Sequence, residues 1–238
     1  MKKVTYCVII PMYNEEENAA RCIDTVMITI LKLKDPIDLL VVNDGSTDRT
    51  AQILRTQKKR YGCRLHIIDQ IPNKGYGTAL QRGIQEASNM KYTFVLFMDS
   101  DLTNDPKDIQ KFVALSTQYD CVKASRFDGK PMKGVPLFRQ FFSYMGNWIA
   151  AACFRIDIKD CTNGFRLVRT DLLAHIQYVE NGFPIIVEEL YELKKQHVRC
   201  ASVPVVLTAR TTSSSRFTYS LQTLLSYAHY AMKAALLS

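Results

Sequence analysis

The sequence FVLFMDSD at residues 94–101 joins an apolar run directly to two acids that are separated by one serine. A short apolar run bounded by turn residues is typical of a strand buried on both faces, as in a parallel sheet. In open α/β sheets, ligands bind in the crevice outside the carboxyl ends of the strands. We therefore expect Asp99 and Asp101 to face such a crevice.

Two interpretations of this acidic pair are open. Asp99 and Asp101 repel each other when held close together, and a divalent cation beside them removes that conflict. Mg²⁺ is held in this way by one or two carboxylates and completed by phosphate oxygens and water. The alternative is a solvated acidic turn after a strand, with Asp105 capping the next helix. The short motif alone does not separate the two.

Apolar runs alternate with amphipathic stretches on both sides of this strand. The expected strands are Val4–Ile10, Leu39–Val42, Leu65–Ile68, Phe94–Met98 and Cys121–Ala124. The expected helices between them are Glu15–Ile30, Asp48–Tyr61, Tyr76–Met90 and Pro106–Ser116. This alternation predicts an α/β fold, with a Rossmann-like, mainly parallel sheet flanked by helices.

The pattern changes after Arg126. We expect a long amphipathic segment at Leu137–Phe154 and a turn-rich polar segment at Asp160–Arg169. A helix at Ile185–Gln196, a strand at Val198–Leu207 and a closing amphipathic helix at Phe217–Leu237 are expected to follow. The Thr/Ser-rich run at 208–215 has the composition of a flexible loop.

Composition narrows the class of protein. The chain has 238 residues, of which 47% are hydrophobic and 23% charged, enough for one sizeable core, which excludes a disordered tail, a collagen or a disulfide-stapled miniprotein. The seven cysteines are odd in number and form no Cys-x-x-Cys, so they indicate neither a disulfide framework nor a zinc site and favour a reducing cytosol. No stretch reaches the roughly 18 uninterrupted apolar residues of a spanning helix.

The net charge of +8 suits a polyanionic partner, and nucleic acid, an anionic membrane face and a nucleotide diphosphate all qualify. A basic nucleic-acid-binding module rests on this charge alone, since the sequence carries no recognisable binding motif. Acids at strand ends would also repel a phosphate backbone in the absence of a metal. We therefore keep that class only as an alternative.

Two other strand ends carry polar motifs. In NDGS, residues 43–46, Gly45 permits a tight turn and Asp44 can accept hydrogen bonds from a base or ribose. PMYNE, residues 11–15, follows the first strand. Each motif alone is no more than a turn signal. Their common position at the carboxyl ends of successive strands predicts one shared site.

These motifs resemble, in order and spacing, the inverting GT-A glycosyltransferases of family 2. The likeness is greatest to the polyprenol-phosphate (dolichol-phosphate) mannosyl- and glucosyltransferases, and it covers nearly the whole chain. The motifs that carry it are Pro11–Glu15, Asn43–Ser46, Asn73–Gly77, Met98–Asp101, Ser125–Phe127, Asp160–Arg166, Val187–Glu188, Val203–Val205 and Arg210–Arg216. The resemblance implies a GT-A fold, with a catalytic domain at 1–215 and a C-terminal amphipathic helix at 216–238.

The resemblance also implies roles for individual residues. The donor nucleotide pocket is expected at Pro11, Tyr13, Glu15, Val42 and Asp44, with Asp44 contacting base or ribose. Asp99 and Asp101 match the Asp-x-Asp pair that holds Mg²⁺ or Mn²⁺ on the diphosphate, with the backbone of Ser100 adjoining. The basic positions near the diphosphate and the acceptor phosphate are expected at Arg126, Arg210 and Arg216.

The chain departs from the family pattern at two positions. Arg216 stands where the family usually has lysine, so a guanidinium fork replaces a point donor and changes the phosphate geometry on offer. Asn43 stands where the family commonly has aspartate, which removes one negative charge beside the nucleotide.

The implied activity is transfer of mannose or glucose from a nucleotide diphosphate sugar, of the GDP-mannose or UDP-glucose type, to a polyprenyl phosphate, with inversion. A phosphate acceptor needs no general base, because its second pKa of about 6 leaves it largely ionised near neutral pH. If the acceptor is instead a hydroxyl of a glycan or glycolipid, a carboxylate base is required, and Glu188 is the candidate. A solvated helix acid is the other interpretation of Glu188.

The segments Leu137–Phe154 and Phe217–Leu237 are rich in apolar residues and poor in charge. Periodicity alone allows them to close the core or to lie in a membrane interface. The resemblance favours peripheral contact with the cytoplasmic face of a membrane, since a polyprenol acceptor stays in its bilayer. The amphipathic tail or a small membrane subunit would supply that contact.

Overall fold

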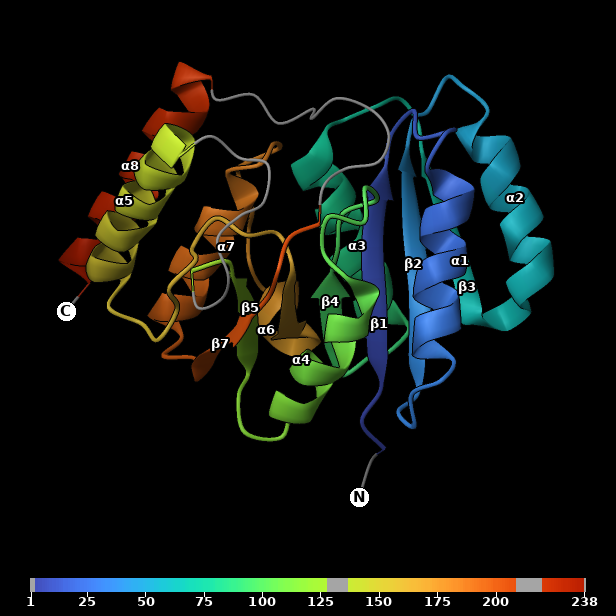
Figure 1. The fold of residues 1–238 in the computed structure, drawn as a ribbon, viewed down its shortest axis with the longest axis horizontal. Coiled ribbons are helices and arrows are strands. Elements are labelled where there is room, and N and C mark those ends of the chain that lie inside the picture. The colour runs from blue at the N-terminus through green and yellow to red at the C-terminus, as the bar shows by residue number, and fades with distance from the viewer. Residues whose placement is uncertain (1–2, 128–136, 209–219, 238) are drawn as a thin grey trace.

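A seven-stranded sheet forms the centre of the molecule, in the order β3-β2-β1-β4-β6-β5-β7 (Figure 1). The computed structural model describes residues 3–127, 137–208 and 220–237. The strands are β1 (Tyr6–Met12), β2 (Ile37–Asp44), β3 (Leu65–Gln70), β4 (Phe94–Phe97), β5 (Cys121–Ser125), β6 (Arg166–Arg169) and β7 (Cys200–Pro204). Only β6 runs antiparallel to its neighbours, β4 and β5, among the described strands. The mainly parallel α/β sheet expected from the sequence is confirmed.

Helices cover both faces of this sheet. They are α1 (Ala19–Ile30), α2 (Thr50–Tyr61), α3 (Tyr76–Asn89), α4 (Ile109–Leu115), α5 (Leu137–Phe154), α6 (Thr170–Ala174), α7 (Ile185–Lys195) and α8 (Leu221–Leu236), with short 3₁₀ turns at Gly62–Arg64 and Pro106–Asp108. The segment expected at Pro106–Ser116 is thus a 3₁₀ turn followed by a helix.

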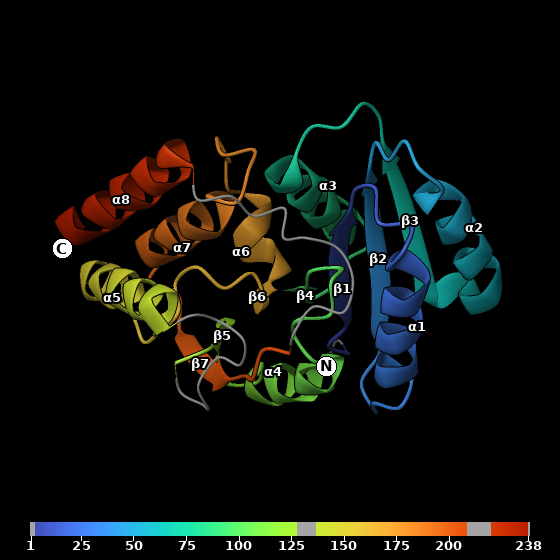
Figure 2. The ribbon, with the colours of Figure 1, turned by 45° about the horizontal axis from the view of Figure 1, so that its top comes forward.

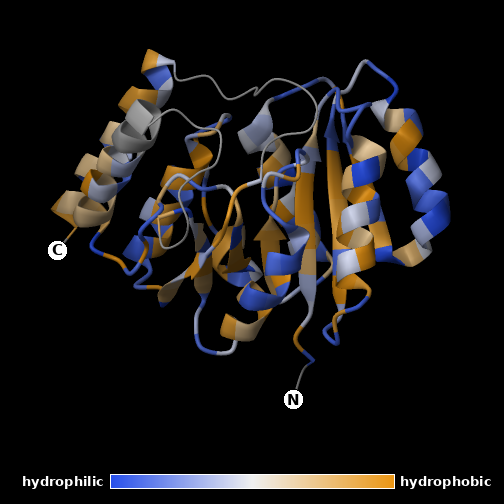
Figure 3. Cartoon of the chain, in the orientation of Figure 1, coloured by the Kyte–Doolittle hydropathy of each residue, from blue (hydrophilic) through white to orange (hydrophobic). Residues whose placement is uncertain are grey.

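The alternation of side chains along β1 explains why two cores form. Tyr6, Val8 and Ile10 pack with α1, α2 and α4 on one face, whereas Cys7 and Ile9 pack with α3, α6 and α7 on the other. Successive side chains of a strand point to opposite faces, so a strand covered on both sides is apolar throughout. Figure 3 shows this as hydrophobic colouring along most of the central strands.

The segment 160–169 was expected to be turn-rich and polar, and the structure corrects this. Its second part is β6, followed by α6. Between two arginines, Leu167 enters one core and Val168 the other, which leaves too short an apolar run for a recognisable strand. Arg166 itself is buried, and its guanidinium is paired with Glu189: Nε donates to Oε1 at 2.5 Å and Nη2 to Oε2 at 2.6 Å.

Helices α5, α7 and α8 lie together beside the β5–β7 side of the sheet, with α5 next to α8 (Figures 1 and 2). The long amphipathic segment expected at Leu137–Phe154 is confirmed as α5, and the closing helix is α8. None of the described helices combines the length and the hydrophobicity that crossing a bilayer requires.

Candidate active site

A cavity of about 680 Å³ opens at the carboxyl ends of β1, β2, β4 and β5, and its wall continues onto α5, α7 and α8. Most of the site residues expected from the sequence line it: Pro11, Tyr13, Glu15, Asp44, Asp99, Ser100, Asp101 and Arg126. Parallel strands that end at one edge of a sheet bring these separate motifs together, as the sequence predicted.

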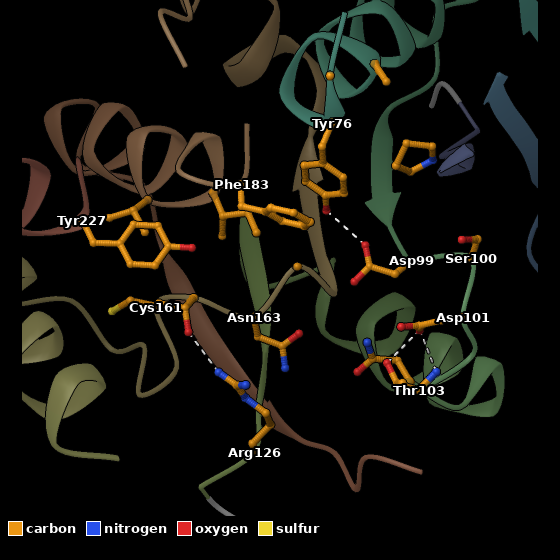
Figure 4. A pocket seen from close by; sticks show the side chains of 18 of the residues that line it. Tyr76, Asp99, Ser100, Asp101, Thr103, Arg126, Cys161, Asn163, Phe183 and Tyr227 are labelled. Carbon is orange, nitrogen blue, oxygen red and sulfur yellow. Dashed lines mark hydrogen bonds between the residues drawn. The ribbon is translucent and has the colours of Figure 1, made fainter. Parts of the chain in front are cut away.

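Asp99 is held from the side of α3 (Figure 4). The Tyr76 hydroxyl donates to Asp99 Oδ1 at 3.1 Å, and the Tyr76 ring stacks on Phe183 with 4.5 Å between centroids. Burial raises the pKa of Tyr76 well above its ordinary value, so the phenol remains a donor at neutral pH. The first acid of the pair is therefore oriented by a neutral hydrogen-bond donor.

Asp101 is oriented within its own turn. Its Oδ1 accepts hydrogen bonds from Thr103 N and Thr103 Oγ1, both at 2.9 Å. Leu102 between them adopts φ of 56°, a left-handed conformation that turns the chain sharply after the acid. Both carboxylates line the cavity (Figure 4).

The donor set at Asp99 and Asp101 fits a hard divalent cation. Carboxylate oxygens are the ligands that Mg²⁺ and Mn²⁺ prefer, and Mg²⁺ is commonly held by one or two carboxylates together with substrate phosphates. Within residues 3–127, 137–208 and 220–237, no group of three or more His, Cys, Asp or Glu side chains is placed to bind a metal. A cation here would accordingly share its ligands between the protein and a phosphorylated substrate.

Arg126, at the end of β5, is fixed by a buried acid. Its Nε and Nη2 donate to Asp160 Oδ2 and Oδ1 at 2.6 and 2.8 Å, and Nη2 also donates to Thr162 Oγ1 at 2.9 Å. Burial raises the pKa of the Asp160 carboxyl, but the Arg126 guanidinium outweighs it and the net pKa lies below the ordinary value. The ion pair thus stays charged at neutral pH and holds one face of Arg126 to the cavity wall.

Asp44 organises the loop at residues 70–75. Its carboxylate accepts from Gln70 Nε2 at 2.6 Å, and from Asn73 Nδ2, Lys74 N and Gly75 N at 2.9 Å each. The turn after Asp44 requires glycine, because Gly45 has φ of 69° and a Cβ there would lie 2.4 Å from Asn73 N. Asp44 therefore shapes the cavity wall, and its contact with a base or ribose stays a prediction.

Comparison with known proteins identifies the family of the chain. The family described as glycosyl transferase family 2 matches residues 7–177. The chain belongs to glycosyltransferase family 2.

Two curated proteins are similar to this family 2 chain. The dolichol-phosphate mannosyltransferase of Pyrococcus furiosus is 29% identical over 88% of this chain and 58% of its own length. The undecaprenyl-phosphate 4-deoxy-4-formamido-L-arabinose transferase of Pectobacterium atrosepticum is 34% identical over 50% of this chain and 36% of its own. The chain thus spans little more than half, or about a third, of these relatives.

A solved structure has the same fold as this family 2 glycosyltransferase. Glucosyl-3-phosphoglycerate synthase from Mycobacterium tuberculosis, in complex with Mn²⁺, UDP-glucose and phosphoglyceric acid, matches with a TM-score of 0.67 at 19% identity over 98% of this chain and 79% of its own. The GT-A fold expected from the sequence is thereby confirmed.

Some site residues expected for the family 2 enzyme do not line the cavity. The side chain of Val42 is wholly buried in the core against α3 and does not line the cavity, and its place in the nucleotide pocket stays a prediction. Glu188 is also buried, and its two carboxylate oxygens accept from the N–H groups of Val179 and Glu180 at 2.8 and 3.0 Å. The Glu188 carboxylate therefore holds the backbone of residues 179 and 180 in place. The sequence suggested a catalytic base or a solvated helix acid, and this buried structural contact is neither of them. Arg210 and Arg216 lie outside the described residues.

The sequence did not reveal the contribution of α8 to the glycosyltransferase cavity. Leu224, Tyr227, Ala228 and Ala231 line it from α8, opposite residues of α5 and α7. The amphipathic pattern of α8 indicated an apolar side, but not the surface that this side faces.

The sequence also did not reveal that the segment 178–183 packs against the start of α3. The Gly77 N–H donates to the Asn181 carbonyl at 2.7 Å, and the two backbones are so close that a Cβ on Gly77 would collide with this segment.

Lys123, on β5, contacts a loop that lines the cavity. It is almost wholly buried, its Nζ donates to the Asn163 carbonyl at 2.8 Å, and it forms no ion pair with a carboxylate of the described residues. Burial, and secondarily the Arg166 charge, lower the pKa of Lys123 to about 8. A charged lysine without an acid partner thus supports the loop that carries Asn163.

Lys123→Met is expected to stabilise the protein at pH 7, because an apolar side chain of similar length removes a buried charge. A pKa lowered from 10.5 to about 8 corresponds to a penalty of the order of 3 kcal/mol. Between pH 8 and 10.5 this lysine is deprotonated in the folded protein but still protonated in the unfolded chain. The stability of the wild type therefore rises with pH in that range, and the advantage of the variant shrinks. Urea unfolding at pH 7 and pH 10 measures both effects. A variant that is less stable at pH 7 would show that the bond to Asn163 outweighs the burial penalty.

Proposed function

We propose that this family 2 glycosyltransferase moves a hexosyl group, mannose or glucose, from a nucleotide diphosphate sugar to a polyprenyl phosphate, with inversion. The observation that carries the proposal is a single cavity with two chemically different ends. One end presents Asp99, Asp101 and Arg126, and the other is built from apolar side chains of α5, α7 and α8. A substrate with a charged phosphate and a long hydrocarbon chain matches such a cavity. The names of the two curated relatives point the same way.

The polar end suits departure of a nucleoside diphosphate. Sugar transfer passes through an oxocarbenium-like transition state while negative charge grows on the leaving group. Mg²⁺ or Mn²⁺ held by Asp99 and Asp101 would neutralise that charge as a Lewis acid. Arg126, fixed by Asp160, adds a preoriented donor whose position costs no reorganisation during the reaction. Pro11, Tyr13, Glu15, Asp44 and Ser100 would surround the nucleotide.

The acceptor is proposed to be a phosphate because the carboxylate expected from the sequence to act as the base for a hydroxyl does not line the cavity. Glu188 is the candidate base from the sequence. Both of its carboxylate oxygens accept hydrogen bonds from backbone N–H groups, and it does not line the cavity. An ionised phosphate monoester needs no base, since its second pKa is about 6. Arg210 and Arg216, matched to the family's basic positions, are proposed to complete the binding of phosphate.

The apolar end supports membrane contact. Side chains of α5 and α8 that point outward are exposed although they are large and hydrophobic, among them Tyr144, Trp148, Leu221, Leu225, Met232 and Leu236. A helix pair with apolar outer positions can lie in the headgroup boundary of a bilayer. We propose that α5 and α8 rest on the cytoplasmic face of a membrane, directly or through a small membrane subunit. Because α8 walls the cavity, we place it with the catalytic unit and not as an independent appendage.

Transfer assays on the full chain test the function. GDP-mannose, UDP-glucose and UDP-N-acetyl sugars are offered with a short-chain polyprenyl phosphate, in parallel with glycan and glycolipid hydroxyl acceptors. We expect one donor to react with the polyprenyl phosphate, a metal chelator to abolish the reaction, and added Mn²⁺ to restore it. Transfer only to hydroxyl acceptors would overturn the proposed acceptor, and full activity in chelator would overturn the role of the metal.

A further inference from the structure

Two side-chain amides that line the cavity each carry one buried atom that has no hydrogen-bond partner within the described part of the chain. Asn163 is 6% exposed, and its Nδ2 is a buried donor without an acceptor. Asn104 is 4% exposed, and its Oδ1 is a buried acceptor without a donor. Buried polar atoms are paired in the large majority of cases, because an unpaired one costs its full desolvation. Two such atoms on the wall of one cavity therefore indicate a ligand that pairs them.

The Asn163 amide is held rigidly in place. Its Oδ1 accepts from Phe165 N at 3.0 Å, which fixes which end of the amide carries the donor. Its backbone carbonyl accepts from Lys123 Nζ. Its neighbour Gly164 packs closely, since a Cβ there would lie 3.2 Å from the Tyr76 hydroxyl oxygen. Nδ2 is the one polar atom of this side chain left for a ligand.

The position of this amide relates it to the acidic pair. Figure 4 shows Asn163 on the cavity wall between Arg126 and Asp99. Asn104 follows shortly after Asp101, beyond the Thr103 turn. A group attached to a diphosphate at Asp99 and Asp101 would therefore be within the same part of the cavity as the two amides.

The chemistry of the two orphaned atoms selects the kind of ligand. A hydroxyl group both donates and accepts, so it satisfies a bare N–H and a bare carbonyl oxygen alike. An ionised phosphate only accepts, and it would be repelled by Asn104 Oδ1. Resting on the function proposed above, we infer that Asn163 Nδ2 and Asn104 Oδ1 form a subsite that binds hydroxyl groups of the hexosyl group being transferred, and so selects the sugar.

Substitution of Asn163 tests this subsite. Asn163→Ala and the isosteric Asn163→Asp, which replaces the donor by an acceptor and keeps Oδ1 for Phe165, are each expected to lower kcat/KM for the nucleotide sugar by about 10- to 100-fold. Asn104→Ala should have a similar effect. The affinity for the nucleoside diphosphate alone, measured by calorimetry with Mn²⁺, should stay unchanged. The matched control is Thr170→Val, which removes an unpaired buried hydroxyl that lies outside the cavity and should leave kcat/KM unchanged.

Donors that lack single hydroxyls identify the bound group. For one deoxy-sugar donor, the wild type should lose activity while Asn163→Ala loses nothing further, because the bond is already gone. A variant that raises KM for the polyprenyl phosphate and leaves the donor unaffected would overturn the inference in favour of a phosphate contact.

A wild type that transfers no sugar would overturn the proposed function and leave the subsite testable. The ratio of the affinities for nucleotide sugar and nucleoside diphosphate then decides: a ratio lowered by Asn163→Ala supports the subsite, and an unchanged ratio overturns it.

Discussion

Asp101→Ala is expected to lower the rate of sugar transfer by about a thousandfold or more, since a Lewis-acid contact to the leaving group contributes several kcal/mol. The change removes one of the two carboxylates of the proposed metal site and leaves the sheet intact. The hydrogen bonds of Asp101 to Thr103 are local to one turn. Thermal unfolding should accordingly change little, and the loss should appear in kcat at saturating donor.

The matched control for this experiment is Asp105→Ala. Asp105 lies in the same loop but does not line the cavity, and its carboxylate accepts from Lys107 N at the start of the 3₁₀ turn. Loss of such a cap costs about 1 kcal/mol of stability without touching the proposed chemistry. If Asp105→Ala lost as much activity as Asp101→Ala, the effect would belong to the loop as a whole and not to a metal ligand.

Arg166→Met is expected to have the largest effect on stability, a loss of about 3–5 kcal/mol, because it leaves the Glu189 carboxylate buried without its partner. Arg166 and Glu189 are each almost wholly buried, and their bidentate pair joins β6 to α7. Arg166 also donates to the Gly164 carbonyl at 2.9 Å and lies over the Phe97 ring at 4.1 Å. Urea unfolding at pH 7 measures the loss.

A double variant separates the charge from the packing. Arg166→Met combined with Glu189→Leu removes both charges and should recover most of the lost stability, as apolar replacements of buried ion pairs commonly do. Arg199→Ala serves as the exposed control: its pairing with Asp120 lies at the surface and is screened by solvent, so this variant should lose little stability. A stable single variant, or a double variant as weak as the single one, would contradict this account.

The layered α/β architecture was predictable because most of its strands contain a short continuous apolar run. Each predicted strand from β1 to β5 overlaps an observed one, and in the central strands burial on both faces explains that run. β6 was not predicted as a strand, because Arg166 is buried through its pairing with Glu189, a residue distant in the sequence. A contact of that kind leaves no periodic signal.

The candidate site was predictable where motifs follow strands. Asp44, Asp99 and Arg126 meet because parallel strands end at one edge. Glu188 shows the limit of such reasoning, because the sequence places an acid on a helix but does not say that its oxygens turn toward residues 179 and 180. The unpaired Nδ2 atom of Asn163 could not be predicted from the sequence for the same reason.

The wall contributed by α8 has a consequence for the order in which the enzyme matures. Domains fold as units during synthesis, starting from the N-terminal end. The sheet can close once β7 has left the ribosome, but the apolar wall stays incomplete until α8, ending at Leu236, has followed. A nascent chain stalled between these points would expose the apolar side chains of α5 and α7 that α8 covers, and chaperones would meet the protein in that state.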